Sequence, residues 1–218
     1  MVEHWSSPER DIMELVRTHT SIPVPRAHGF LYNGELPDLL VTDYIPGRRL
    51  SEVWPTMSVF SKFWVIVTLR SYVQQLRGVL APYAGPPGPY IFDGEECFFP
   101  IKHLINLEIK FENYQQLKDW FNSIGPPYSD SPLVLCHADL HQDNIIVGDD
   151  GQLWLVDWEM SGFYPKWFEQ KFMMRYHDRT WKIIAGVVCG HNPWALQWWR
   201  EFARRGSKDS PSTFRGRW

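Results

Sequence analysis

The residues of this chain best suited to chemistry are two aspartates and an asparagine that follow short apolar runs. The run Leu133 to Cys136 precedes Asp139, Asn144 follows that aspartate by five residues, and the run Leu153 to Val156 leads directly into Asp157. One carboxylate can accept the proton of an attacking hydroxyl, while an amide and a second carboxylate hold magnesium ions at the phosphates. The set is therefore typical of phosphoryl transfer from ATP to a hydroxyl group.

A short hairpin must bring these side chains together. Asn144 to Val147 and Leu153 to Val156 are apolar runs of strand length, and the turn sequence Gly148-Asp149-Asp150-Gly151 separates them. An Asp-Gly step between two such runs predicts a β-hairpin. We expect Asn144 and Asp157 at neighbouring strand ends, close to Asp139.

The N-terminal part of the chain predicts one helix and two strands. Ser7-Pro8-Glu9 has the cap and the proline that begin a helix, and Ile22-Pro23 should follow its end. His28 to Tyr32 and Leu39 to Tyr44 are strand-like and are joined by a turn-rich stretch. Ile45-Pro46-Gly47 ends the second strand.

The rest of the chain is mostly helical by pattern, so the predicted fold class is α+β. Ser61 to Leu80 has apolar residues at helical spacing, whereas the Pro- and Gly-rich stretch Ala81 to Phe99 predicts a loop. Further helices are expected in the ranges 101–124, 167–178, 182–188 and 193–204.

The His-x-Asp-x4-Asn signature followed by Asp157 resembles the aminoglycoside phosphotransferase and choline kinase group, relatives of the protein kinases. The likeness is closer to the large fungal set of phosphotransferase-family proteins within that group. Several further segments in the right order resemble it, from about Glu9 to the region of Ala185: Thr20 to Pro25, Val41 to Gly47, Val156 to Glu159, Gly162 to Pro165, and Trp167 to Glu169.

The resemblance implies a protein-kinase-like fold with a reduced N-terminal lobe. Residues 1–46 would form this partial lobe, a helix plus a short antiparallel sheet, and the hinge. Residues 47–205 would form a mostly helical C-terminal lobe that carries the catalytic hairpin, and residues 206–218 a disordered basic tail.

The resemblance also assigns roles to individual residues. Asp139 would be the catalytic base, His137 a structural member of the catalytic loop, and Asn144 and Asp157 the Mg²⁺ ligands. The backbone around Asp43, Tyr44 and Ile45 would bind the adenine of ATP. Glu9, with Asp11 as a weaker candidate, would match the glutamate that pairs with a phosphate-binding lysine.

That lysine and the glycine-rich hairpin of the family are not found in the sequence ahead of Glu9, and Lys62 is the first lysine of the chain. A preorganised cation at a transferring phosphate contributes orders of magnitude in rate. A second hypothesis is therefore a catalytically inactive pseudoenzyme, a binding or scaffold module that retains the larger lobe. A metal-dependent hydrolase is a weaker third, because no ligand set has suitable spacing.

Three other polar residues near the motifs have simpler interpretations. We expect His141 and Asp143 to be exposed loop residues rather than substrate contacts. Glu159 is expected to make a structural hydrogen bond at least as readily as to assist at the metal.

Composition gives no indication of a nucleic-acid, membrane or disulfide-dependent function. The net charge of −3 gives no case for nucleic-acid or membrane binding, and three distant cysteines indicate no disulfide framework. No signal peptide or membrane-length apolar run is present, so the sequence predicts a cytoplasmic protein.

Asp157-Trp158-Glu159 is not followed by protein-kinase activation landmarks, so the expected acceptor is a small-molecule hydroxyl compound. The oligomeric state stays open.

Overall fold

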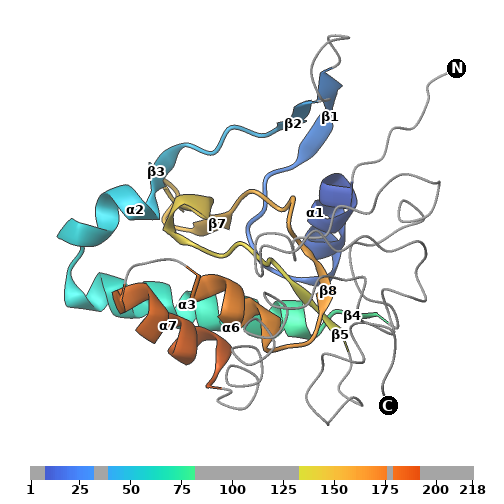
Figure 1. Cartoon of the computed structure of the whole chain (residues 1–218). Coiled ribbons are helices and arrows are strands. Elements are labelled where there is room, and N and C mark those ends of the chain that lie inside the picture. Colours follow the sequence, from blue (N-terminus) through green and yellow to red (C-terminus); the bar gives the residue numbers. More distant parts are fainter. Residues whose placement is uncertain (1–7, 32–38, 82–132, 176–178, 192–218) are drawn as a thin grey trace, which may run out of the picture.

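The computed structural model describes residues 8–31, 39–81, 133–175 and 179–191. Within these ranges, helices and three small antiparallel sheets alternate along the chain (Figure 1). Several expectations lie outside the described residues: the Ser7 cap, the 33–37 turn, almost all of the 81–99 loop, the helices expected in 101–124 and 193–204, and the basic tail.

The N-terminal helix and hairpin form as the sequence predicts. Helix α1, Pro8–His19, has acidic residues in its first turn and basic residues in its last, which suits the helix dipole. Its buried face is Ile12, Met13 and Val16. Strand β1, Ala27–Leu31, then pairs antiparallel with β2, Leu39–Thr42.

Residues 43–46 connect this hairpin to a strand that the sequence did not predict. Strand β3, Gly47–Arg49, pairs antiparallel with β6, Ile145–Gly148. A Cβ on Gly47 would lie 2.4 Å from the backbone oxygen of Val147, so this pairing requires glycine. The Pro46-Gly47 pair predicted only the end of the preceding strand, but Gly47 also allows two backbones to approach each other.

A layer of helices supports the remaining strands. After the short helices α2, Leu50–Val53, and η1, Trp54–Thr56, comes α3, Val59–Arg77, whose N-cap Ser58 accepts a hydrogen bond from the Ser61 N–H. Helix α7, Arg179–Cys189, packs against both α3 and α6, Phe168–Met173 (Figure 1). No helix in the described part of the chain is long and apolar enough to cross a bilayer.

Two sheets deliver the candidate site residues. The predicted hairpin is confirmed as β6 and β7, Leu153–Leu155. Strand β5, Leu133–Cys136, lies between β4, Leu80–Ala81, and β8, Gly162–Tyr164. The three residues of β8 are fully buried, so they lack the alternation that reveals a longer strand in a sequence. The core between these sheets and the helices contains Leu69, Leu76, Leu135, Leu140, Trp158, Met173, Trp181 and Ile184.

Candidate active site

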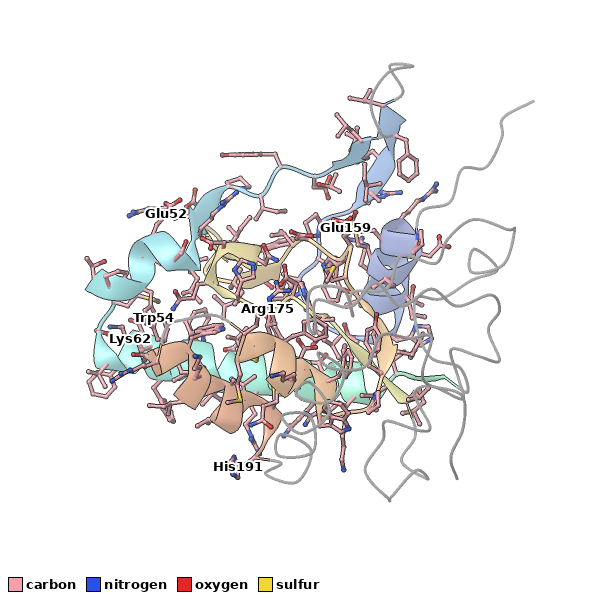
Figure 2. The ribbon with its side chains drawn as sticks, in the orientation of Figure 1. Glu52, Trp54, Lys62, Glu159, Arg175 and His191 are labelled. Carbon is pink, nitrogen blue, oxygen red and sulfur yellow. The ribbon has the colours of Figure 1, made fainter. Side chains whose placement is uncertain are left out.

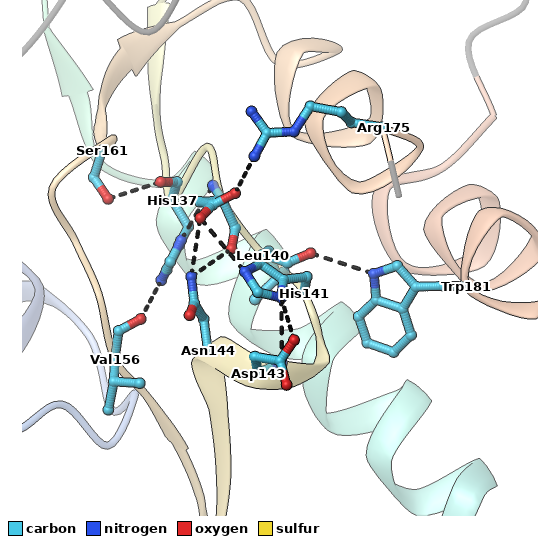
Figure 3. A network of polar contacts seen from close by, with 10 residues as sticks. His137, Leu140, His141, Asp143, Asn144, Val156, Ser161, Arg175 and Trp181 are labelled. Atoms are coloured by element: carbon cyan, nitrogen blue, oxygen red, sulfur yellow. Dashed lines mark hydrogen bonds and ion pairs between the residues drawn. The ribbon is translucent and has the colours of Figure 1, made fainter. Parts of the chain in front are cut away.

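Asp139 and Asn144 meet in the loop between β5 and β6. The short helix η3, Gln142–Asn144, turns the chain so that the Asn144 amide points back at Asp139. Asn144 Nδ2 donates to the backbone oxygen and to Oδ2 of Asp139, both at 3.1 Å (Figure 3). The structure therefore brings the predicted base and one predicted metal ligand into direct contact.

Asp157 completes the group from the end of β7. Its pKa is raised, first by partial burial and then by the negative charge of Asp139, while the Asn144 side chain opposes the rise. Asn144 thus interacts with both carboxylates. Since its nitrogen contacts Asp139, the oxygen of the same amide is the atom that a magnesium ion would use.

The backbone is strained at two points of this group. Among the described non-glycine residues, Ala138 and Asp157 are the ones with positive φ, at 62° and 65°. A residue held in the left-handed region costs about 1–3 kcal/mol, and such strain concentrates at functional sites. Ala138 lies in the first of the two segments predicted to carry the chemistry, and Asp157 lies in the second.

His137 connects these two segments and is fully buried. Its Nδ1 accepts the Asp139 N–H at 3.3 Å, so Nε2 carries the proton and donates to the Val156 carbonyl at 3.1 Å. Burial lowers the pKa of His137 to about 4, and its ring lies 4.5 Å from that of Trp158 between centroids. This geometry suits the predicted structural role rather than proton transfer.

Glu169 in α6 binds the backbone of the predicted catalytic loop, and the sequence analysis gave it no role of its own. Its Oε2 accepts the backbone N–H groups of His137 at 2.6 Å and Ala138 at 3.4 Å. Burial raises the pKa of Glu169 to about 7, against those two hydrogen bonds and the charge of Arg77. A local sequence pattern could not reveal this role, because the partner of Glu169 lies 32 residues away in sequence.

Two further side chains contact Asp139. Arg175 Nη2 lies 2.9 Å from Oδ1, and His141 Nε2 lies 3.5 Å from Oδ2. His141 lies in the loop as expected, but the expectation that it is exposed is wrong, because its side chain is only 15% exposed and contacts Asp139. Asp143 is half exposed, as expected.

Glu9 lies beside the segment that is predicted to bind metal, Asp157 to Glu159. Its Oε1 accepts the backbone N–H of Trp158 at 3.2 Å, and burial together with the charges of Asp157 and Glu159 raises its pKa. The first turn of α1 therefore contacts the residues that follow β7. Asp11 lines a cavity of about 310 Å³ together with Arg10, Arg17 and Arg26.

Lys62, the first lysine of the chain, is far from this group. Its Nζ lies 5.4 Å from the centre of the Trp54 ring, near the start of α3. Figure 2 shows Lys62 and Trp54 at one end of the molecule, well separated from Glu159 and Arg175. Lys62 therefore does not lie at the group of Asp139, Asn144 and Asp157.

The segment expected to bind adenine is partly occupied by its own contacts. The Asp43 carboxylate accepts the Arg26 N–H at 3.0 Å and contacts His28 Nε2 at 2.6 Å, which lowers the Asp43 pKa. The Asp43 N–H donates to the Arg26 carbonyl at 2.9 Å. These contacts engage the side chain and the N–H of Asp43, and the backbone of Asp43, Tyr44 and Ile45 stays the predicted adenine contact.

The donor set fits magnesium better than a softer metal. Asn144 and Asp157 offer hard oxygen ligands, and Asp139, Glu9 and Glu159 add negative charge around them. No group of three His, Cys, Asp or Glu side chains able to hold a metal occurs among the described residues. A magnesium site formed by two protein ligands with phosphates and water does not need one.

Removing the Glu169 carboxylate should destabilise the chain. Glu169→Ala leaves two buried N–H groups without their acceptor, and each such loss costs about 1–3 kcal/mol. We expect a free energy of unfolding lower by about 2–6 kcal/mol in urea melts. Glu169→Gln keeps an acceptor oxygen and should lose less than half of that; equal losses would show that these hydrogen bonds do not support the loop.

Glu169 and His137 should have opposite effects on stability as pH changes. Because burial lowers the pKa of His137 to about 4, its contribution to stability is lost as pH falls below about 6.5. Because the pKa of Glu169 is raised to about 7, the folded state keeps a proton that the unfolded state releases above about 4.5, so stability rises as pH falls.

Glu169→Gln should therefore expose the acid sensitivity of His137. Relative to wild type, we expect the variant to lose about 3 kcal/mol between pH 7 and pH 4.5, measured by urea unfolding. A difference between the two proteins that does not change with pH would contradict the raised pKa of Glu169.

Comparisons with known proteins were made on the whole chain. The family model described as "Phosphotransferase enzyme family" matches residues 6–181. No curated protein sequence matches significantly.

Similar solved structures have low sequence identity to this chain. They include spectinomycin phosphotransferase in complex with ADP and spectinomycin (16% identity, TM-score 0.49, covering 95% of this chain and 75% of that one). Macrolide 2′-phosphotransferase from Brachybacterium faecium has 14% identity, a TM-score of 0.47 and coverage of 93% and 74%. Choline kinase from Streptococcus pneumoniae has 16% identity, a TM-score of 0.43 and coverage of 93% and 74%.

Proposed function

Because this chain belongs to the phosphotransferase enzyme family, we propose that it transfers the γ-phosphoryl group of ATP to a hydroxyl group of a small molecule, with Mg²⁺ as cofactor. The observation that carries the proposal is the Asn144 amide in contact with Asp139 and interacting with Asp157. Family membership and the observed mixture of helices with small antiparallel sheets agree with the predicted α+β, protein-kinase-like fold.

In the proposed reaction Asp139 orients the acceptor hydroxyl and receives its proton. The acceptor oxygen forms a bond to the γ-phosphorus, the bond from that phosphorus to the bridging oxygen breaks, and ADP leaves. Asn144 and Asp157 would hold magnesium, which neutralises phosphate charge when bound. His137 and Glu169 fix the backbone that carries Asp139.

The backbone of Asp43, Tyr44 and Ile45 remains our proposal for adenine binding. These residues lie between β2 and β3, and the following Gly47 pairs with the β6 strand that Asn144 precedes. An adenine held there would place its phosphates toward the group of Asp139, Asn144 and Asp157. The division into a partial lobe of residues 1–46, a catalytic lobe of 47–205 and a tail also remains a proposal.

A binding module without catalysis is the second candidate. It is favoured by the surroundings of Glu9, whose pKa is raised first by burial and then by the carboxylates of Asp157 and Glu159. In that case nucleotide binding would persist without transfer.

Incubation with Mg²⁺ and ATP labelled at the γ-phosphate separates the two functions. The acceptors tested would be small hydroxyl compounds of several classes: aminoglycosides, amino alcohols such as choline, and sugars. We expect labelled product with at least one class. Nucleotide binding without transfer to any acceptor or to water would support the binding module instead.

A further inference from the structure

We propose that Arg175 binds the γ-phosphoryl group of the nucleotide and holds it against the acceptor side of Asp139. This inference rests on the proposed function and adds a residue to it. It starts from the 2.9 Å contact between Arg175 Nη2 and Asp139 Oδ1. Figure 3 shows Arg175 approaching the catalytic loop from the side opposite to Val156.

Position places Arg175 within reach of the phosphoryl group. A hydroxyl that gives its proton to Asp139 must lie at hydrogen-bond distance from that carboxylate, about 2.6–3.2 Å. The phosphorus that the hydroxyl attacks is its next neighbour. A guanidinium already in contact with the same carboxylate therefore borders the space that the phosphoryl oxygens must enter.

The chemistry of the side chain suits this position. A guanidinium presents its N–H donors in a planar fork, so it can keep one donor on Asp139 and offer others to phosphate oxygens. The Arg175 side chain is 32% exposed, so a ligand can reach it, whereas that of Asp139 is 14% exposed.

Charge also favours a phosphate partner. Glu9, Asp139, Asp157 and Glu159 make the site acidic, which disfavours an incoming polyphosphate. Among the salt bridges of the described residues, the one between Arg175 and Asp139 joins a guanidinium to these carboxylates. Such a cation at a transferring phosphoryl group stabilises the charge of the transition state.

Arg175 is held on a supported backbone. Its N–H donates to the Phe172 carbonyl at 3.0 Å, in the turn that ends α6. The same helix supplies Glu169, which binds the loop backbone at His137 and Ala138. The element that fixes the catalytic loop therefore also fixes the arginine, which is the preorganisation that a phosphoryl contact requires.

Calorimetric titration with Mg²⁺ and either AMP-PNP or ADP tests the proposal, because the two nucleotides differ in the γ-phosphoryl group. Arg175→Gln should weaken AMP-PNP binding about tenfold and change ADP binding less than twofold. Arg175→Lys should recover part of the loss. The matched control is Arg179→Gln, since Arg179 is an exposed arginine at the start of α7.

The outcomes separate this inference from the proposed function. Unchanged binding of both nucleotides by Arg175→Gln, or equal weakening of both, would overturn the inference and leave Arg175 as a brace of the loop or a contact of the acceptor. A wild-type chain that binds neither nucleotide would overturn the proposed function, and the inference with it.

Discussion

Replacing Asp139 with asparagine should lower the rate of phosphoryl transfer by about 10²–10⁴-fold, the usual contribution of a positioned acid or base. Asparagine has nearly the same shape but cannot accept the acceptor's proton. It also lacks the charge that pairs with Arg175 at 2.9 Å. Transfer of labelled γ-phosphate measures the loss.

Nucleotide binding distinguishes this chemical effect from a collapsed site. Asn144 can still hydrogen-bond the backbone oxygen of residue 139, so Asp139→Asn should bind Mg²⁺-ATP within a fewfold of wild type. Asp149→Asn is the matched control, because Asp149 is exposed in the turn between β6 and β7. A variant that transfers phosphate at the wild-type rate would exclude Asp139 as the base.

Replacing Asp157 with asparagine should remove magnesium-dependent nucleotide binding without harming the fold. The Asp157 carboxylate is the anionic metal ligand of the proposed site, so its loss should weaken Mg²⁺-ATP by about 100-fold or more. At φ 65° asparagine is among the better tolerated residues, and the substitution removes repulsion with Asp139 and Glu9.

The ligand-free Asp157→Asn variant should therefore be as stable as wild type or slightly more stable. The partly exposed position limits any gain to about 1 kcal/mol or less. Urea unfolding without ligand gives the stability, and titration calorimetry with Mg²⁺-ATP gives the binding. Loss of stability together with binding would instead indicate that Asp157 has a structural role in the turn after β7.

Local patterns in the sequence predict the centre of the site well. Two apolar runs around an Asp-Gly turn are sufficient to define the β6–β7 hairpin, and the residue spacing then places Asn144 beside Asp139. The hydrogen bonds involved close over few residues, so short-range rules apply. Helix α1 is predicted for the same reason, since its proline, its apolar stripe and the later Ile22-Pro23 are all local signals.

The residues that sequence reasoning missed act across long separations. Glu169 and Arg175 reach the loop only because α6 packs behind it, and no local pattern specifies that packing. His141 was expected to be exposed because loops usually are, but the turn η3 directs its ring at Asp139. Strand β3 was hidden because Gly47 serves both as a break and as the point where two backbones approach.

The charge of the site gives magnesium a specific physical role. Burial and neighbouring carboxylates raise the pKa of both Glu9 and Asp157, so the charged forms of these side chains are disfavoured in the ligand-free site. A divalent cation at Asn144 and Asp157 would relieve this repulsion before any phosphate arrives. Nucleotide affinity should therefore depend more on Mg²⁺ than the charge of ATP alone requires.

The most direct measurement is titration calorimetry of the wild-type chain with ATP, in the presence of Mg²⁺ and in its absence with a chelator. It needs no knowledge of the acceptor. We predict one-to-one binding with Mg²⁺ and at least tenfold weaker binding without it. A well-folded chain that does not bind ATP under either condition, or binds it equally well without magnesium, would contradict the assignment of Asn144 and Asp157.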